Sequence, residues 1–405
     1  MTDGTITTKA KGANALCVTN NGEVNISGTT IKSTAESSGR GLHATYGGKI
    51  IASKVNVSSK GKSCATLATD RGEGTVTCSE CTLSTEGAGS PLIYSTGSIS
   101  VSKTTGTSSG AQAVVVEGKN TASVLEGSEL TCFGLPNRKD VDKCGIMLYQ
   151  SMSGDADSGT STFNCKSSTI KIDSSSSVSK STPMFFITNT DAVINLERCT
   201  FTYDSDIFLD TRGTTEWGDT GTNGGVVTLN LKNQNIKGDF VVDQYSGLTI
   251  SLENSSIEGK INSEKTGAKV NIVMDADSKI TLTGNSYYTS LTNAGADSNI
   301  IKGSFTLEKY DEKDISRPST SGKGDSGEGP GDHEGEGDFN PKDGSDRPKK
   351  PDGSDGFPEG NPPDKPGDDS KDENEGEGEE EGSGAQTFNH FTKVAIGLLF
   401  ILILQ

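Results

Sequence analysis

Closely spaced cysteines are the first candidates for chemistry in this sequence. Cys78-Ser-Glu-Cys81 has the spacing of redox motifs and of half a structural zinc site. A structural zinc site takes four ligands, usually from two such pairs, and this sequence contains one pair. We therefore expect Cys78 and Cys81 to be small apolar core residues or members of disulfides, and we expect no bound metal or other cofactor.

The single histidine of the folded body is the next candidate. His43 lies between Leu42 and Ala44, two apolar residues that alternate with it, so its ring should face solvent. A lone surface imidazole with no evident partner is a poor general base. We therefore expect His43 to be inert.

The cysteines and His43 lie within a sequence repeat. Turn residues Gly22, Gly48 and Gly74 open the similar segments GEVNISGTTIKST, GKIIASKVNVSSK and GTVTCSECTLSTE, each 26 residues after the last. Counted from the turn residue, apolar side chains recur at +2 and +4, then at +7 and +9, and a third short strand precedes the turn. Alternation with a reset between pairs predicts short strands and corners, three of each per coil. Coils of this kind stack into an all-β parallel β-helix, a solenoid, over residues 1–310.

The repeat also assigns a direction to most of the cysteines. Cys78 and Cys81, at +4 and +7, should point inward, and Cys165 and Cys199 occupy the same slots in later coils. Cys17 falls between two inward positions and should point outward. Cys132 and Cys144 flank a polar insertion that runs from Cys132 to Tyr149, and a disulfide between them is the pairing we favour. The even count of eight fits an oxidising compartment.

Composition agrees with a solenoid. Only 30% of the chain is hydrophobic and 51 residues are glycine, which suits a narrow stacked core better than one wide core. The repeats resemble right-handed parallel β-helices of the pectin-lyase-like class, especially its adhesin-like surface proteins. The stretch MDADSKITLTGNSYYTSLTNAGADSNIIKGSFTLE is similar to the final coils of such proteins.

Enzymes of that class use residues that are largely missing here. Polygalacturonases combine Asn-Thr-Asp with a paired Asp, Gly-His-Gly and Arg-Ile-Lys, and this chain has only Asn189-Thr190-Asp191 in its body. Its one Asp-Asp pair, Asp368-Asp369, lies in the acidic tail. The resemblance therefore implies a fold more strongly than an activity.

Pectate lyases of the class need clustered aspartates for calcium, with Arg and Lys on one strand face. Asp155 and Asp157, and likewise Asp275 and Asp277, are isolated pairs without that company. We expect the protein not to be an enzyme, and a polysaccharide lyase or hydrolase is the alternative.

Two loops and three sequons are candidate surface sites. The second insertion, TRGTTEWGDTGTNGG, carries the only tryptophan, Trp217, which would contact a ligand if exposed or cap nearby strands if folded back. Asn25, Asn56 and Asn254 each begin an Asn-X-Ser glycosylation sequon.

Residues 311–385 form a segment of different composition. They hold 24 acidic and 9 basic residues and few apolar ones, which predicts a disordered acidic stalk. The body carries no basic stripe, so we expect no nucleic-acid partner.

The C-terminal residues 386–405 predict the location of the protein. The C-terminus fits a glycosylphosphatidylinositol (GPI) signal, which needs small residues, a polar spacer and an apolar tail. These are Ser383-Gly384-Ala385, the next eight residues, and the eleven apolar residues Val394 to Leu404. We expect attachment at Ser383, and Gly382 and Gly384 are close alternatives. Eleven residues are too few for an ordinary membrane span, so a short single-pass anchor is the alternative. Release from cells by phosphatidylinositol-specific phospholipase C tests this expectation.

The N-terminus, MTDGTITTKAKG, has no apolar run of the kind that opens a secretory signal, so we expect a truncated N-terminus. The whole sequence favours a non-enzymatic, adhesin-like protein of the outer cell surface. It would bind carbohydrate or a partner surface and attach to the membrane through its lipid anchor. A structural coat protein without a ligand is a second alternative.

Overall fold

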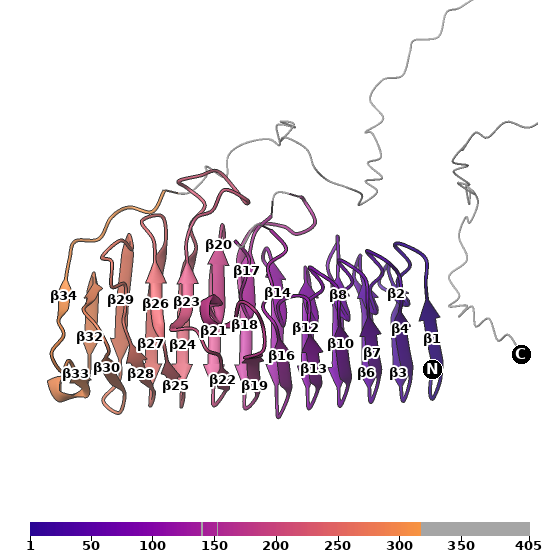
Figure 1. Cartoon of the computed structure of the whole chain (residues 1–405), viewed down its shortest axis with the longest axis horizontal. Helices are drawn as coiled ribbons and strands as arrows, with labels where there is room; N and C mark the ends of the chain where they lie inside the picture. The colour runs from indigo at the N-terminus through magenta and orange to yellow at the C-terminus, as the bar shows by residue number, and fades with distance from the viewer. Residues whose placement is uncertain (139–140, 152, 317–405) are drawn as a thin grey trace, which may run out of the picture. The chain divides into compact units, whose positions relative to one another are not determined.

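The computed structural model describes residues 1–138, 141–151 and 153–316, and these form a β-solenoid of three parallel sheets. Neighbouring strands within each sheet come from successive coils, so every sheet follows chain order from the indigo N-terminus to the orange end in Figure 1. The predicted all-β parallel β-helix is therefore confirmed in its class, and the last strand ends at Lys309. The helical elements of the described residues are two short 3-10 turns, η1 (Ser179–Ser181) and η2 (Asp297–Asn299).

Each sheet collects one strand per coil. The first sheet consists of β1 (Thr5–Thr8), β4 (Thr30–Ser33), β7 (Asn56–Ser59), β10 (Thr82–Thr85), β13 (Thr105–Ser108), β16 (Glu129–Cys132), β19 (Thr169–Ile172) and β22 (Thr200–Thr202). The second sheet consists of β2 (Leu16–Val18), β5 (Leu42–Ala44), β8 (Leu67–Thr69), β11 (Ile93–Ser95), β14 (Val114–Glu117), β17 (Ile146–Tyr149), β20 (Phe185–Thr188), β23 (Ile207–Thr211) and β26 (Asp239–Val242).

The third sheet is the longest. It consists of β3 (Glu23–Ser27), β6 (Gly48–Ser53), β9 (Gly74–Ser79), β12 (Ser98–Ser102), β15 (Thr121–Leu125), β18 (Thr160–Lys166), β21 (Asp191–Glu197), β24 (Val226–Lys232), β27 (Gly247–Glu253), β29 (Lys269–Met274) and β32 (Ser290–Asn293). The last coils add a four-stranded sheet of β25 (Asn235–Lys237), β28 (Ser256–Gly259), β30 (Lys279–Leu282) and β33 (Ile300–Ile301), and a pair of β31 (Ser286–Tyr288) with β34 (Leu307–Lys309).

The strand register matches the predicted repeat. Gly48 pairs with Gly74 and Ile50 with Val76, and the apolar residues at +2 and +4 of these coils lie in the core. Farther along, Phe185 packs edge-to-face against Phe163, Phe201 and Phe208 at centroid distances of 5.2–5.7 Å. The coils thus share one continuous apolar core, because no single coil can bury its own face.

The corner after the third sheet has the same backbone conformation in most coils. A residue with positive φ stands there, which turns the chain and resets the inward face. Buried hydroxyls satisfy the turned backbone: Thr104 Oγ1 accepts from Cys81 N at 3.3 Å, and Ser128 Oγ accepts from Thr104 N at 3.2 Å. The positive-φ positions are Gly28, Lys54, Glu80, Lys103, Glu126, Ser167, Arg198, Asn233 and Asn254.

Candidate functional site

The outward face of the second sheet is covered along much of its length, although simple alternation predicts that it faces water. Loops that leave the coils fold over it, and β5, β8, β14 and β20 are buried on both faces. The strand register stacks one outward residue per coil in the order Cys17, His43, Ala68, Tyr94, Val115, Met147, Phe186, Asp210. The candidate chemistry lies at the Cys17 end of this row.

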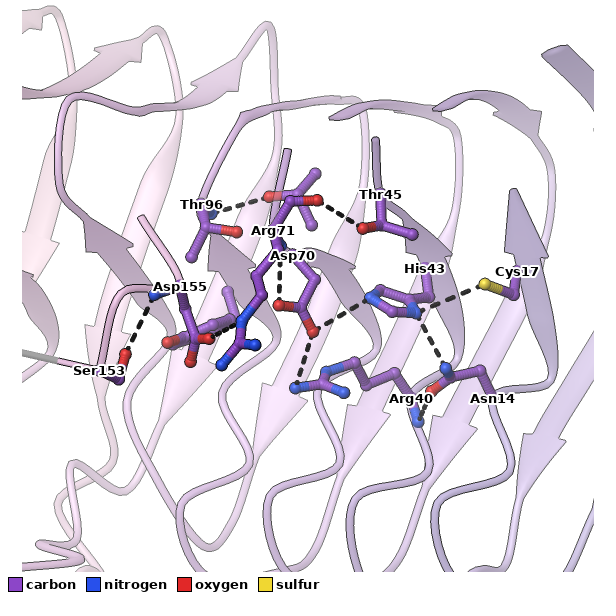
Figure 2. Close-up of polar contacts among 12 residues, drawn as sticks. Asn14, Cys17, Arg40, His43, Thr45, Asp70, Arg71, Thr96, Ser153 and Asp155 are labelled. Atoms are coloured by element: carbon purple, nitrogen blue, oxygen red, sulfur yellow. Dashed lines mark hydrogen bonds and ion pairs between the residues drawn. The ribbon is translucent and has the colours of Figure 1, made fainter. Parts of the chain in front are cut away.

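His43 is the centre of that end, and the prediction that it faces solvent is wrong. Its residue is only 6% exposed, because side chains from the adjacent coils surround the ring. Asn14 Oδ1 accepts a hydrogen bond from Arg40 N at 2.9 Å, which directs Asn14 Nδ2 to His43 Nδ1 at 2.8 Å (Figure 2). Nδ1 must then be the acceptor, so the ring proton of the neutral imidazole lies on Nε2.

Asp70 lies beside that proton. Its Oδ2 is 3.5 Å from His43 Nε2 and 3.4 Å from Arg40 Nη2, and its Oδ1 accepts from Arg71 N at 2.8 Å. Burial on its own would raise the pKa of Asp70, but the interactions with His43, Arg40 and the Arg71 amide outweigh it and lower that pKa to about 2. Asp70 is therefore a carboxylate at neutral pH and holds the imidazole orientation.

Cys17 completes the row on the other side of the ring. Its Sγ lies 3.7 Å from His43 Nδ1, and the residue is exposed, as the repeat predicts. Partial burial of the sulfur raises the pKa of Cys17, Arg40 lowers it, and Asp70 raises it, with a net upward shift. Cys17 therefore rests as a thiol next to the Nδ1 side of the imidazole. Cys17, His43 and Asp70 follow one another in the order of nucleophile, base and orienting carboxylate that covalent catalysis uses.

A loop from a later coil braces this cluster. Arg71 Nε reaches Asp155 Oδ1 at 2.6 Å, and Lys119 Nζ lies 3.0 Å from Asp157 Oδ2 and 3.2 Å from Glu73 Oε1 (Figure 2 shows the Arg71 contact). Asp155 and Asp157 are therefore each paired with a basic residue. Each carboxylate ties its loop to an earlier coil through an ion pair.

The other predicted aspartate pair is structural as well. Asp275 accepts from Ser278 Oγ at 2.5 Å and from Asn254 N at 2.9 Å, and these bonds fix a corner. Its pKa is lowered chiefly by the hydrogen bond from Ser278.

A second candidate site is a groove of about 470 Å³ on the outward face of the third sheet. Three asparagines in register form its floor, which we call the asparagine ladder: Asn164, Asn195 and Asn230. Asn230 Nδ2 donates to Asn195 Oδ1 at 2.8 Å, and Asn195 Nδ2 donates to Asn164 Oδ1 at 2.8 Å. The amides are thereby aligned along the long axis of the solenoid.

Charges alternate beside the asparagine ladder. Lys166, Glu197, Lys232 and Glu253 are stacked in register, with ion pairs of 2.9 Å between Lys166 and Glu197 and 2.6 Å between Lys232 and Glu253. Two positive and two negative charges balance, so this edge of the groove is close to neutral. The sequence interpretation missed both rows. The Asn of FNCK, INLE and LNLK at one outward position was the signal that could have found them.

Asn189-Thr190-Asp191 forms a corner of the solenoid. Asn189 adopts φ 53° and donates from Nδ2 to Gln150 O at 2.8 Å, while buried Thr190 bonds from Oγ1 to Gly159 O at 3.3 Å. These bonds hold the loop between β17 and β18 against the next coil. The triplet has a structural role here.

Trp217 is buried, so the prediction of an exposed ligand contact is wrong and the folded-back alternative is correct. Its residue is 6% exposed, its ring meets Tyr149 edge-to-face at 5.2 Å, and the Arg138 guanidinium lies 5.9 Å from the ring centroid. It caps the covered face of the second sheet with Val115, Cys144, Met147 and Phe186.

The favoured disulfide between Cys132 and Cys144 is also wrong. Both thiols are free and buried, but Cys132 packs in the main core whereas Cys144 packs in the outer cluster with Trp217. The inward cysteines instead form the disulfides Cys78–Cys81 and Cys165–Cys199. Within the described ranges no three His, Cys, Asp or Glu side chains are grouped so that they could hold a metal ion.

The remaining predicted sites lie at the surface or outside the described part of the chain. Asn25, Asn56 and Asn254 are exposed, as glycosylation would require. Ser383, most of the acidic segment and residues 386–405 lie outside the described residues. In the part that is described, no helix is long and apolar enough to span a membrane.

Comparisons with protein-family models, with curated proteins and with solved structures returned no match. The geometry of the two sites is therefore the basis of the functional proposal.

Proposed function

We propose that this protein is a non-enzymatic, adhesin-like solenoid of the cell surface that binds an extended, neutral polysaccharide along the groove of its third sheet. The observation that carries the proposal is the asparagine ladder. Parallel strands place the three amides about 4.8 Å apart. This spacing is close to the advance of one sugar ring in an extended chain.

The asparagine ladder leaves hydrogen-bonding capacity for a ligand. A carboxamide has two N–H donors and two acceptor lone pairs, and the contact between neighbours uses one donor of one side chain and one lone pair of the next. The remaining donor and lone pair of Asn195 suit hydroxyl groups, which both donate and accept. Leu125 and the 44% exposed Val273 line the same groove and suit the apolar faces of sugar rings.

Charge supports a neutral polymer over a polyanion. The lysines that would attract carboxylates are each paired with a glutamate, Lys166 with Glu197 and Lys232 with Glu253. A polyuronate would have to displace those glutamates and would be repelled by them.

The same pairs disfavour glycoside hydrolysis in the groove. A general acid of a glycosidase needs a raised carboxyl pKa. The pKa of Glu197 is instead lowered, chiefly by the hydrogen bond from Lys166. Display at the cell surface rests on the acidic segment and the lipid-anchor signal that the sequence predicts.

Binding of the full chain to neutral and anionic polysaccharides by calorimetry tests this proposal. We expect a neutral polymer to bind, and Asn195→Ala to weaken its affinity about tenfold, which corresponds to loss of about 1.4 kcal/mol or one to two hydrogen bonds. Thr131→Ala on β16 of the first sheet is the matched control and should bind as the parent does.

Two outcomes would contradict the proposal. One is equal affinity of the parent and a folded Asn195→Ala variant. The other is release of reducing ends or of unsaturated products from the bound polymer, which would support the hydrolase or lyase alternative.

A further inference from the structure

Cys17 differs from every other cysteine of the chain. Four of the eight cysteines form disulfides, and Cys64, Cys132 and Cys144 are buried, so Cys17 is the one exposed thiol. It lies on β2, the edge strand of the second sheet, with His43 beside it. We infer that Cys17 is a covalent attachment site that captures small disulfide-bearing molecules by thiol–disulfide exchange, with His43 accepting the thiol proton. This activity is independent of polymer binding.

The tautomer of His43 supplies the base. Arg40 N holds the Asn14 amide so that Nδ1 is an acceptor, and the carboxylate of Asp70 faces Nε2, where the proton is (Figure 2). The lone pair on Nδ1 accepts a hydrogen bond from Asn14 Nδ2 at 2.8 Å, and Cys17 Sγ lies 3.7 Å from the same nitrogen. When the Asn14 amide yields its place, Nδ1 can take the proton of the thiol, and Asp70 stabilises the imidazolium that forms.

A base is needed at this site because the thiol does not ionise readily. The pKa of Cys17 is raised, chiefly by burial of the sulfur, so little thiolate exists at neutral pH. Proton transfer to His43 produces the nucleophile only as the reaction proceeds. The thiolate is the attacking species in disulfide exchange.

The step balances without a further oxidant. Cys17 Sγ attacks one sulfur of the incoming disulfide and its proton passes to His43 Nδ1. The sulfur–sulfur bond of the reagent breaks and a new bond joins Cys17 to one half. The other half leaves as a thiolate and recovers the proton from His43, so one disulfide and one thiol yield one mixed disulfide and one thiol.

The site is open to such a molecule. Cys17 is exposed although His43 is buried, so the sulfur forms the boundary between solvent and the base. Two disulfides elsewhere in the body fit an oxidising compartment, in which disulfides are the available reagents.

The test is reaction of the native full chain with the aromatic disulfide 5,5′-dithiobis(2-nitrobenzoate), followed by the absorbance of the released thiolate. We expect one thiol per chain to react in a fast phase, and peptide mapping to find the adduct on Cys17. His43→Gln should slow that phase at least tenfold at pH 7. It should also shift the rise in rate to more alkaline pH, because reaction then depends on ionisation of the thiol alone.

Controls separate this role from a structural one. Cys17→Ser should abolish the fast phase, and Cys64→Ser, which removes a buried thiol, should leave it unchanged. The inference is overturned if mapping of the unmodified protein places the first adduct on another cysteine. It is equally overturned if folded His43→Gln reacts at the parental rate with the parental pH profile.

Discussion

Asp210 shows how the covered face of the second sheet imposes a cost on a single residue. It pairs in register with Phe186 and is 7% exposed, with its Oδ2 3.2 Å from Arg212 Nε. Burial raises the pKa of Asp210, Arg212 lowers it and Asp243 raises it, with a net pKa of about 6. The folded protein therefore holds a carboxyl group that is hard to ionise.

This pKa shift predicts that Asp210→Asn stabilises the folded protein in a pH-dependent way. The pKa of Asp210 is higher in the folded than in the unfolded protein. Its contribution to the free energy of unfolding is therefore fully present below about pH 4 and is lost as the pH rises through about 6. At pH 8 the loss is about 3 kcal/mol, and asparagine avoids it. The melting temperature of the variant should exceed that of the parent at pH 8 and approach it at pH 4. An equal difference at both pH values would contradict the account, and exposed Asp277→Asn is the control.

For single residues, the sequence predicted the direction in which a side chain points better than it predicted what surrounds that side chain. Alternation placed Cys17 and His43 on the outward face correctly. It could not show that Asn14 and Asp70 from the adjacent coils, with Arg40 from the same coil, would enclose the ring. Burial of Trp217 depends on the path of its loop over the second sheet, which has no periodic signal. The local pattern fixes where a side chain points, whereas distant segments decide what covers it.

Strands and corners were the most predictable elements, because each coil repeats the same constraint. The inward slots at +4 and +7 placed Cys78 beside Cys81, and Cys165 beside Cys199 one coil later. The pattern left apolar stacking and disulfide formation open, since both need the same buried positions. The predicted disulfide between Cys132 and Cys144 is wrong because Cys132, at the end of β16, packs in the main core, whereas Cys144, in the loop before β17, packs in the outer cluster.

The two disulfides should contribute unequally to stability. A cross-link restricts the unfolded chain more when it closes a longer loop, and the sequence separations are 34 for Cys165–Cys199 and 3 for Cys78–Cys81. Replacing both cysteines of the longer link with alanine should cost about 4 kcal/mol, against about 2 kcal/mol for the shorter one. Denaturant unfolding of both double variants measures this, and each serves as the control for the other. A larger loss from the shorter link would be inconsistent with this explanation.

On the scale of the whole molecule, stacking of the coils brings residues that are far apart in the sequence together on one long surface. One outward position per coil becomes a row along the solenoid, and in the third sheet that row carries the asparagine ladder beside alternating Lys and Glu. The repeat was sufficient to predict the stack. The proposed ligand-binding face was not predicted, because its asparagines, Asn164, Asn195 and Asn230, are 31 and 35 residues apart and become neighbours only through the register.

Lysine footprinting of the full chain, with and without the neutral polysaccharide that we propose as its ligand, tests the central claim most directly. Lys166 and Lys232 line the groove and are about half exposed, with side-chain exposures of 51% and 52%, whereas Lys32 lies exposed on the first sheet. Bound polymer should lower the acetylation of Lys166 and Lys232 and leave that of Lys32 unchanged. Unchanged labelling of both groove lysines, with protection on the first sheet instead, would contradict it.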